Sequence, residues 1–185
     1  MRLLLATHNP HKLREFARLL PGIELDGLPD GALAPEETGD TYAENALIKA
    51  YAAARATGRT AIADDSGIEA EALGWAPGVR TARYAGEHAT DAENLAKLAE
   101  EAPAGSRARY VCVIAYVDGE ERLFEGRCTG TVAAEPRGTG GFGYDPVFIP
   151  DDFPGRTMAE LSDGEKDAIS HRGRAARALQ AWLQG

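Results

Sequence analysis

The stretch that decides the fold is Tyr110–Val117, which reads YVCVIAYV and is apolar on both of its alternating faces. A strand covered on one side only would alternate apolar with polar residues, so this pattern predicts a central strand covered on both faces. Asp118 and Gly119 follow as a favoured two-residue turn, and residues 120–134 continue as a second strand. The sequence therefore predicts a hairpin within a larger sheet.

The same hairpin register determines what the two cysteines can do. It places Cys112 opposite Glu125, three positions along the strand from Cys128. That offset separates two side chains by about 10 Å, which is too far for a disulfide. We expect two reduced thiols, as is usual in a cytoplasmic protein.

Outward from the hairpin, helix and strand patterns alternate. An N-cap and proline at Asn9-Pro10 and capping boxes at Thr41 and Thr90 predict three helices, and a fourth is expected over residues 172–184, burying Trp182. Short apolar runs predict further strands at residues 2–6, 23–28, 60–63 and 147–149. This order predicts an α/β fold with a mixed β-sheet and flanking helices.

Composition excludes several classes of protein. The 185 residues include 20 basic and 29 acidic side chains, a net charge of −9, which argues against binding nucleic acid through its phosphates. The longest apolar run, Tyr110–Val117, is far shorter than the roughly 20 residues of a membrane-spanning helix. Met1–Leu5 leads directly into polar residues, unlike a secretory signal. We expect a single cytoplasmic domain over residues 1–185, with no membrane partner.

The first candidate site is the helix start, residues 7–12 (THNPHK). A helix N-terminus carries partial positive charge, so Lys12 and Arg14 in the first turns are unfavourable unless an anion is present. Backbone amides, Thr7, Asn9 and Lys12 could hold a phosphate there. Equally, this segment could be a solvent-facing turn whose charges cost little.

The second candidate site is acidic. Glu36 and Glu37 precede a helix, and Asp64 and Asp65 end a predicted strand. Carboxylates that arrive from separate segments suit Mg²⁺, which uses few protein ligands and keeps room for water and phosphate oxygens. The alternative is a solvated turn, because Asp-Asp-Ser-Gly is also a common turn sequence.

The third candidate is the glycine-rich loop Gly138–Gly143, followed by Tyr144-Asp145-Pro146. It contains G-x-G-x-x-G, but a dinucleotide-binding fingerprint should open a helix, whereas a strand follows here. The loop presents Phe142 and Tyr144, which could stack a nucleobase or could instead plug the core.

The fourth candidate lies near the C-terminus. Lys166 could bind phosphate, and His171 and Arg172 could donate hydrogen bonds to a carbonyl-bearing ligand. These residues could equally be caps and surface residues at the start of the last helix.

Taken together and in order, these segments resemble one family, the non-canonical purine nucleoside triphosphate pyrophosphatases, also called the inosine triphosphate pyrophosphatase or Ham1-like family. The stretches that carry the resemblance are residues 6–12, 36–39, 44–46, 63–67, 82–84, 140–146 and 169–172. The resemblance implies an elongated mixed sheet in two lobes around a central cleft, a homodimer and a Mg²⁺ cofactor. It also implies hydrolysis of ITP, dITP and XTP to the monophosphate and pyrophosphate, which cleanses the nucleotide pool.

The resemblance also assigns roles to individual residues. Asp65 is implied as the catalytic base, and the implied metal site comprises Glu37, Asp65, Glu36 and Asp64. The remaining positions are implied to bind substrate: Thr7, His8, Asn9, Pro10, His11, Lys12, Ser66, Phe142, Gly143, Tyr144, Asp145, Lys166, His171 and Arg172.

Two other functions remain open from sequence. The chain could bind and sequester inosine nucleotides without turnover, although the acidic set would then be superfluous. It could also be a nucleotide phosphatase that releases orthophosphate. In the pyrophosphatase reading, His171 or Arg172 donates to the 6-oxo group, and the 6-amino group of adenine is rejected because two donors would face each other.

Overall fold

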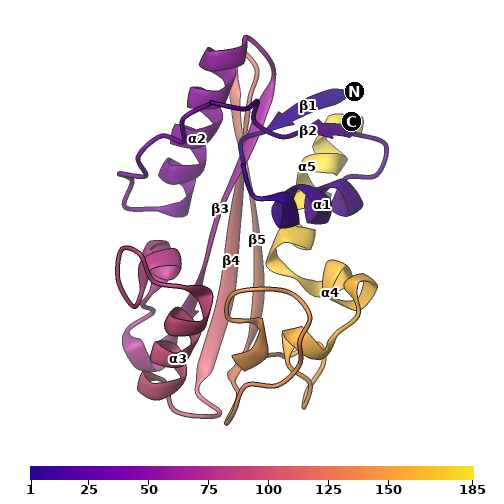
Figure 1. Ribbon diagram of the computed structural model, residues 1–185. Helices are drawn as coiled ribbons and strands as arrows, with labels where there is room; N and C mark the ends of the chain where they lie inside the picture. The colour runs from indigo at the N-terminus through magenta and orange to yellow at the C-terminus, as the bar shows by residue number, and fades with distance from the viewer. The chain divides into compact units, whose positions relative to one another are not determined.

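A computed structural model describes residues 1–185 and confirms the α/β class (Figure 1). Six strands form one sheet in the order β2-β1-β3-β4-β5-β6, in which β1 pairs parallel with β2 and β3, and β5 pairs antiparallel with β6. The strands are β1 Arg2–Leu5, β2 Glu24–Asp26, β3 Ala61–Ala70, β4 Arg107–Val117, β5 Glu121–Val132 and β6 Phe148–Pro150. The α-helices are α1 Pro10–Leu19, α2 Tyr42–Thr57, α3 Asp91–Glu101, α4 Asp163–Ile169 and α5 His171–Gln184.

The hairpin prediction is confirmed in its main feature. β4 lies between β3 and β5, and every residue of Tyr110–Val117 is buried. The predicted two-residue turn was wrong, because residues 118–120 all lie outside the strands and the Asp118 amide donates to the Glu120 carbonyl at 3.0 Å. Both cysteines are buried, and neither forms a disulfide, as predicted.

β3 is longer than the sequence indicated. The prediction ended it at residue 63 before a turn, whereas the strand continues through Asp64, Asp65, Ser66 and Gly67 to Ala70. Acidic residues are unfavourable inside a sheet unless their charges are paired. Both aspartates are paired with cationic side chains, which allows the strand to continue.

The chain divides into two compact units. Unit 1 comprises residues 1–65, 112–126 and 172–185, and unit 2 comprises residues 66–111 and 127–171. The chain passes from one unit to the other four times, after Asp65, Val111, Gly126 and His171. The central cleft that we expected stays a prediction.

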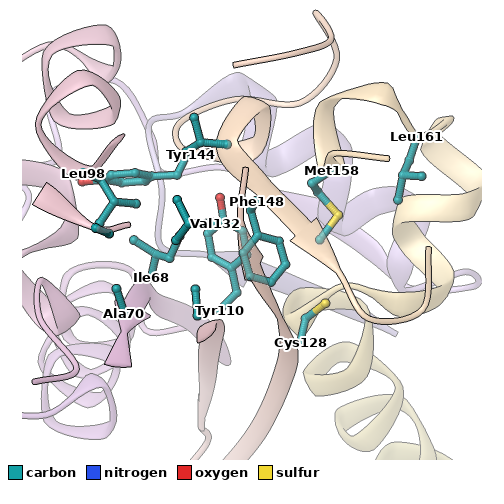
Figure 2. Close-up of a cluster of buried hydrophobic side chains, with 13 residues drawn as sticks. Ile68, Ala70, Leu98, Tyr110, Cys128, Val132, Tyr144, Phe148, Met158 and Leu161 are labelled. Atoms are coloured by element: carbon teal, nitrogen blue, oxygen red, sulfur yellow. The ribbon is translucent and has the colours of Figure 1, made fainter. Parts of the chain in front are cut away.

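Each unit has its own hydrophobic core. In unit 1, Phe16 of α1 and Leu179 of α5 pack with Ile114 of β4. Trp182 was expected to be buried, but it is 36% exposed, although its ring packs against Tyr116 and Phe124. The core of unit 2, shown in Figure 2, is built around Ile68, Leu98, Tyr110, Val132, Tyr144 and Phe148.

The structure contains no helix with the length and hydropathy needed to cross a membrane.

Candidate functional site

The start of α1 is held by its own side chains. Asn9 is the N-cap, and its Oδ1 accepts from the amides of His11 at 2.8 Å and Lys12 at 3.4 Å, while Thr7 Oγ1 accepts from the Asn9 amide at 3.0 Å. The preceding segment is tied by His8 Nε2, which donates to the Ala32 carbonyl at 2.8 Å. Two amides that we expected to face a phosphate are therefore already capped.

Two other predicted residues of this segment have plain local roles. Pro10 is the first residue of α1, where its missing N–H costs nothing. His11 is exposed, and its Nδ1 accepts from Arg14 at 3.0 Å.

The anion that the cationic helix start faces is a carboxylate of the protein itself. Lys12 Nζ lies 3.0 and 3.1 Å from the two oxygens of Asp64 on β3. Arg172, at the start of α5, donates from Nε to Asp64 Oδ2 at 3.3 Å, and its Nη1 lies 3.5 Å from Oε2 of Glu15. Arg172, one of the two predicted donors to a nucleobase together with His171, lies in this buried ionic chain, and its contact with a base stays a prediction.

Asp65 belongs to a separate ion pair. Neighbouring residues of a strand point to opposite faces, so Asp65 points away from Asp64. Its Oδ1 lies 3.0 Å from Nζ of Lys49, and the same ammonium lies 3.0 Å from Oε1 of Glu37. Its Oδ2 is buried and has no hydrogen-bond partner.

These contacts shift the acidity of the two aspartates in opposite directions. Burial by itself would raise the pKa of Asp64, but the charges of Lys12, Arg172 and Lys49 outweigh burial and hold that pKa well below its usual value. For Asp65, burial outweighs the attraction of Lys49, so its pKa is raised above the ordinary 3.8. Burial lowers the pKa of Lys49, but the surrounding carboxylates outweigh it and the net shift is upward.

The loop that carries Glu37 is anchored by the next helix. The side chain of Asn45 on α2 accepts from the Gly39 amide at 2.8 Å and donates to the Gly39 carbonyl at 3.3 Å. A side chain at position 39 would lie 2.7 Å from Asn45 Oδ1, so only glycine allows this approach. Glu36, in contrast, is exposed.

The structure does not gather the four predicted metal ligands around one point. Asp64 and Asp65 point to opposite faces of β3, and no group of three or more His, Cys, Asp or Glu side chains is arranged to hold a metal ion. Of the four, only Glu37 and Asp65 lie close to a common point, which is occupied by the Lys49 ammonium.

A cavity of about 370 Å³ opens beside this cluster in unit 1. Its walls are largely apolar and include Leu28, Pro35 and Ala53. The polar side chains that line it are Thr7, His8, Asn9, Lys12, Glu37, Lys49 and Asp64. The cavity therefore presents two ammonium groups and two carboxylates to a ligand.

Unit 2 holds the other predicted residues. Asp145 is 3% exposed, and its Oδ2 accepts from Lys166 Nζ at 2.7 Å and from the Phe142 amide at 3.1 Å. Gly141 has φ +67°, and a Cβ there would overlap Asp145 Oδ2. The glycine-rich loop is thus folded tightly onto a buried carboxylate.

The aromatic residues of this loop differ in what they offer a ligand. Phe142 is half-buried, and the Lys166 ammonium lies 5.1 Å from its ring centroid. Tyr144 is buried, with its hydroxyl donating to the Thr81 carbonyl at 2.6 Å, so it plugs the core. The Gly143 amide donates to Asp91 of α3 at 3.3 Å.

The remaining predicted residues lie on β3, α4 and α5. Ser66 is half-buried on β3. Lys166 and His171 are 6% and 3% exposed, so the interpretation of this segment as a solvated cap was wrong. Lys166 sits on α4, which begins at a capping box formed by Ser162 and Glu165.

Comparison of the sequence with known protein families gives a match over almost the whole chain. The model of the Ham1 family matches residues 3–182. The chain belongs to the Ham1 family.

Relatives of this Ham1 chain cover nearly its full length. It is 52% identical over 97% of its length to a dITP/XTP pyrophosphatase of Symbiobacterium thermophilum, covering 93% of that protein, and 47% identical over 96% to one of Escherichia coli O157:H7, covering 95% of it. A solved HAM1 protein from Coxiella burnetii is 43% identical with a TM-score of 0.88, and the alignment covers 100% of this chain and 98% of that one.

Sequence reasoning missed Lys49 as a site residue of this Ham1 chain. The buried positions of α2 include residues 42, 45, 46, 50 and 53, and Lys49 follows Asn45 and Ala46 at helical spacing. A lysine on the buried side of a helix is a signal that the sequence offered, because an ammonium there needs a carboxylate partner.

Proposed function

We propose that this chain hydrolyses non-canonical purine nucleoside triphosphates, with dITP, ITP and XTP as substrates, to the monophosphate and pyrophosphate. The observation that carries the proposal is the cavity of unit 1, in which Lys12 and Lys49 lie beside the paired carboxylates of Glu37, Asp64 and Asp65. The relatives named dITP/XTP pyrophosphatase support dITP and XTP as substrates. Such an enzyme removes deaminated purines from the nucleotide pool.

A divalent cation, which we take to be Mg²⁺, fits the residues present. Glu37 and Asp65 approach one position, and the buried Asp65 Oδ2 has no hydrogen-bond partner. Mg²⁺ usually takes only one or two carboxylates together with water and phosphate oxygens. When bound, it would neutralise phosphate charge beside an acidic protein. Glu36 and Asp64 are proposed as nearby acidic residues rather than as ligands equal to Glu37 and Asp65.

The chain's own residues supply orientation and proton transfer. Lys12 and Lys49 attract the triphosphate, and Thr7, His8 and Asn9 line that end of the cavity. Pro10 and His11, which follow in the first turn of α1, are proposed as further substrate contacts outside this lining. Asp65 accepts the proton of the attacking water as the general base. Orientation and charge neutralisation contribute most of the catalysis of phosphoryl chemistry.

The base is proposed to be recognised by unit 2. The half-buried Phe142 stacks on the purine, and Ser66, Gly143, Tyr144, Asp145, Lys166 and His171 form its surroundings. Arg172 contributes to nucleotide binding through Asp64, with which it is paired. A hydrogen-bond donor at His171 favours a 6-oxo purine over adenine.

A product assay tests the proposal. The protein is incubated with dITP, XTP, dGTP or dATP and Mg²⁺, and the products are separated by ion-exchange chromatography. We expect dIMP and pyrophosphate in equal amounts from dITP, with little turnover of dATP. Unchanged dITP would favour the sequestering protein, and orthophosphate would favour a nucleotide phosphatase. Omission of Mg²⁺ or addition of EDTA should abolish turnover.

Three properties complete the proposal. We infer one pyrophosphatase domain over residues 1–185, a homodimer and a cytoplasmic location. The two cysteines, neither of which forms a disulfide, support a reducing compartment. Sedimentation analysis of the purified protein tests the dimer.

A further inference from the structure

One buried tyrosine contacts two separate segments of unit 2. Tyr110, on β4, is 6% exposed. Its hydroxyl donates to Asp145 Oδ1 at 3.0 Å. Its ring stacks on the imidazole of His171, with the ring centroids 4.5 Å apart and an angle of 7° between the planes. The two partners lie after β5 and at the start of α5, so a single side chain bridges distant parts of the sequence.

The contact with Asp145 extends to the glycine-rich loop. Tyr110 occupies one oxygen of that carboxylate, while the other accepts from Lys166 and from the Phe142 amide. The orientation of the carboxylate therefore determines where the Phe142 backbone and the Lys166 ammonium lie. A change at the Tyr110 hydroxyl should reach both groups through Asp145.

Tyr110 is itself held rigidly. Its ring packs edge-on against Phe148, with the centroids 4.7 Å apart, inside the core shown in Figure 2. It lies on a strand whose residues are buried from Tyr110 to Val117. A tyrosine has few rotatable bonds, so a ring packed in this way can fix its partners at little entropic cost.

We propose that Tyr110 is a positioning residue for purine recognition, which sets the glycine-rich loop through Asp145 and the His171 imidazole through ring stacking. The inference rests on the proposed function, because it assigns a task to unit 2 in that reaction. Tyr110 is not proposed to contact the reacting atoms. It acts on the residues that hold the base.

Tyr116 offers a matched control on the same strand. It is also 6% exposed, and its hydroxyl lies 3.3 Å from a carboxylate oxygen of Asp118, but it belongs to unit 1 and packs against Trp182. Tyr116→Phe therefore removes a tyrosine–aspartate hydrogen bond from β4 without touching the residues that Tyr110 contacts.

The test compares Tyr110→Phe, Tyr110→Leu and Tyr116→Phe in steady-state hydrolysis of dITP and dATP. Tyr110→Phe keeps the ring and loses the bond to Asp145, so we expect KM for dITP to rise about fivefold with kcat within about twofold. Tyr110→Leu also loses the stacking on His171, and the preference for dITP over dATP should fall about tenfold. Tyr116→Phe should match the wild type.

Two measurements separate positioning from simple destabilisation and from failure of the proposed function. The amide NMR signal of Phe142 should shift in Tyr110→Phe but not in Tyr116→Phe, whatever the reaction. Binding of dIMP, measured by calorimetry, should weaken about fivefold in Tyr110→Phe. An unshifted Phe142 amide, or variants that lose thermal stability while KM, selectivity and dIMP affinity stay at wild-type values, would overturn the inference. A wild-type protein that binds dIMP without cleaving dITP would refute only the proposed reaction.

Discussion

The candidate residues of unit 1 and unit 2 are held in place by different forces. In unit 1, charges balance charges: Lys12 and Arg172 pair with Asp64, and Lys49 pairs with Asp65 and Glu37. In unit 2, a single buried ion pair between Lys166 and Asp145 is combined with hydrogen bonds, ring stacking and close backbone packing around Asp145. An ionic cluster can exchange partners when an anion or metal arrives, whereas a packed loop presents a fixed shape. The difference suits the chemistry that we propose for unit 1 and the base recognition that we propose for unit 2.

The two tryptophans allow each unit to be followed separately. Trp182 belongs to unit 1 and Trp75 to unit 2, and they are the only tryptophans in the chain. A Trp75→Phe background therefore reports unfolding of unit 1 by fluorescence, and a Trp182→Phe background reports unit 2. With these two backgrounds, the stability of each unit can be measured in the same chain.

The largest effect is expected from Asp65→Asn. The substitution keeps the shape of the side chain but removes the proposed proton acceptor and a proposed metal ligand, so kcat for dITP should fall by about 10³-fold. Pyrophosphate release measures the effect, and circular dichroism checks that the fold is retained. Turnover within a factor of ten of the wild type would remove Asp65 from the chemistry and weaken the contrast between the units.

Lys49→Met should destabilise unit 1. It leaves the neighbouring carboxylates of Glu37 and Asp65 without their shared cation, which should lower the free energy of unfolding by about 3 kcal/mol. Because those carboxylates could then bind a divalent cation, MgCl₂ should recover part of the loss in the absence of nucleotide. Urea denaturation in the Trp75→Phe background measures both effects.

Lys97→Met is the matched control for this prediction. Lys97 pairs with Glu101 on an exposed face of α3 in unit 2, so its removal, measured in the Trp182→Phe background, should cost less than about 0.5 kcal/mol. Equal losses for the two lysines, or no response of Lys49→Met to MgCl₂, would contradict the ionic account of unit 1.

Gly141→Ala should destabilise unit 2 through steric overlap. Position 141 has φ +67°, and a Cβ there would meet Asp145 Oδ2, so the free energy of unfolding should fall by about 2 kcal/mol. Gly143 is the matched control, because its φ is +62° but no atom lies within 4 Å of where a Cβ would stand. Gly143→Ala should cost about 1 kcal/mol, which is the cost of the backbone conformation alone. Equal losses would show that packing against Asp145 does not hold the loop.

The smallest effect concerns pH. Hydrogen bonds from Arg2 and Arg59 lower the pKa of Asp26 in unit 1 from 3.8 to about 2, and Arg156 together with the Ser162 amide lowers that of Glu165 in unit 2 from 4.5 to about 2. A lowered folded-state pKa stabilises the fold above the ordinary value, and this stabilisation is lost as pH falls toward about 2. Asp26→Asn should reduce the loss in free energy of unfolding of unit 1 as the pH falls below about 4. Glu165→Gln should do the same for unit 2. An unchanged pH dependence of unfolding for both variants, each measured in the tryptophan background of its own unit, would refute these assignments.

Local patterns predicted much of the fold because their causes are local. The capping boxes at Thr41 and Thr90 and the N-cap at Asn9 are present, and the apolar run of β4 is buried. The errors arose where distant partners decide. β3 continues through Asp64 and Asp65 because cations from α1, α2 and α5 pair with them, and no pattern near residue 64 reveals those cations.

The site shows the same division. The sequence by itself determined which residue types were available: acidic pairs, a cationic helix start and a glycine loop with aromatic residues. Only the tertiary structure decided that Asp64 and Asp65 separate to opposite faces, that Lys49 stands between Asp65 and Glu37, and that Tyr110 meets both Asp145 and His171. Composition and periodicity follow from neighbours along the chain, whereas ion pairs and ring stacking depend on which strands and helices pack together in three dimensions.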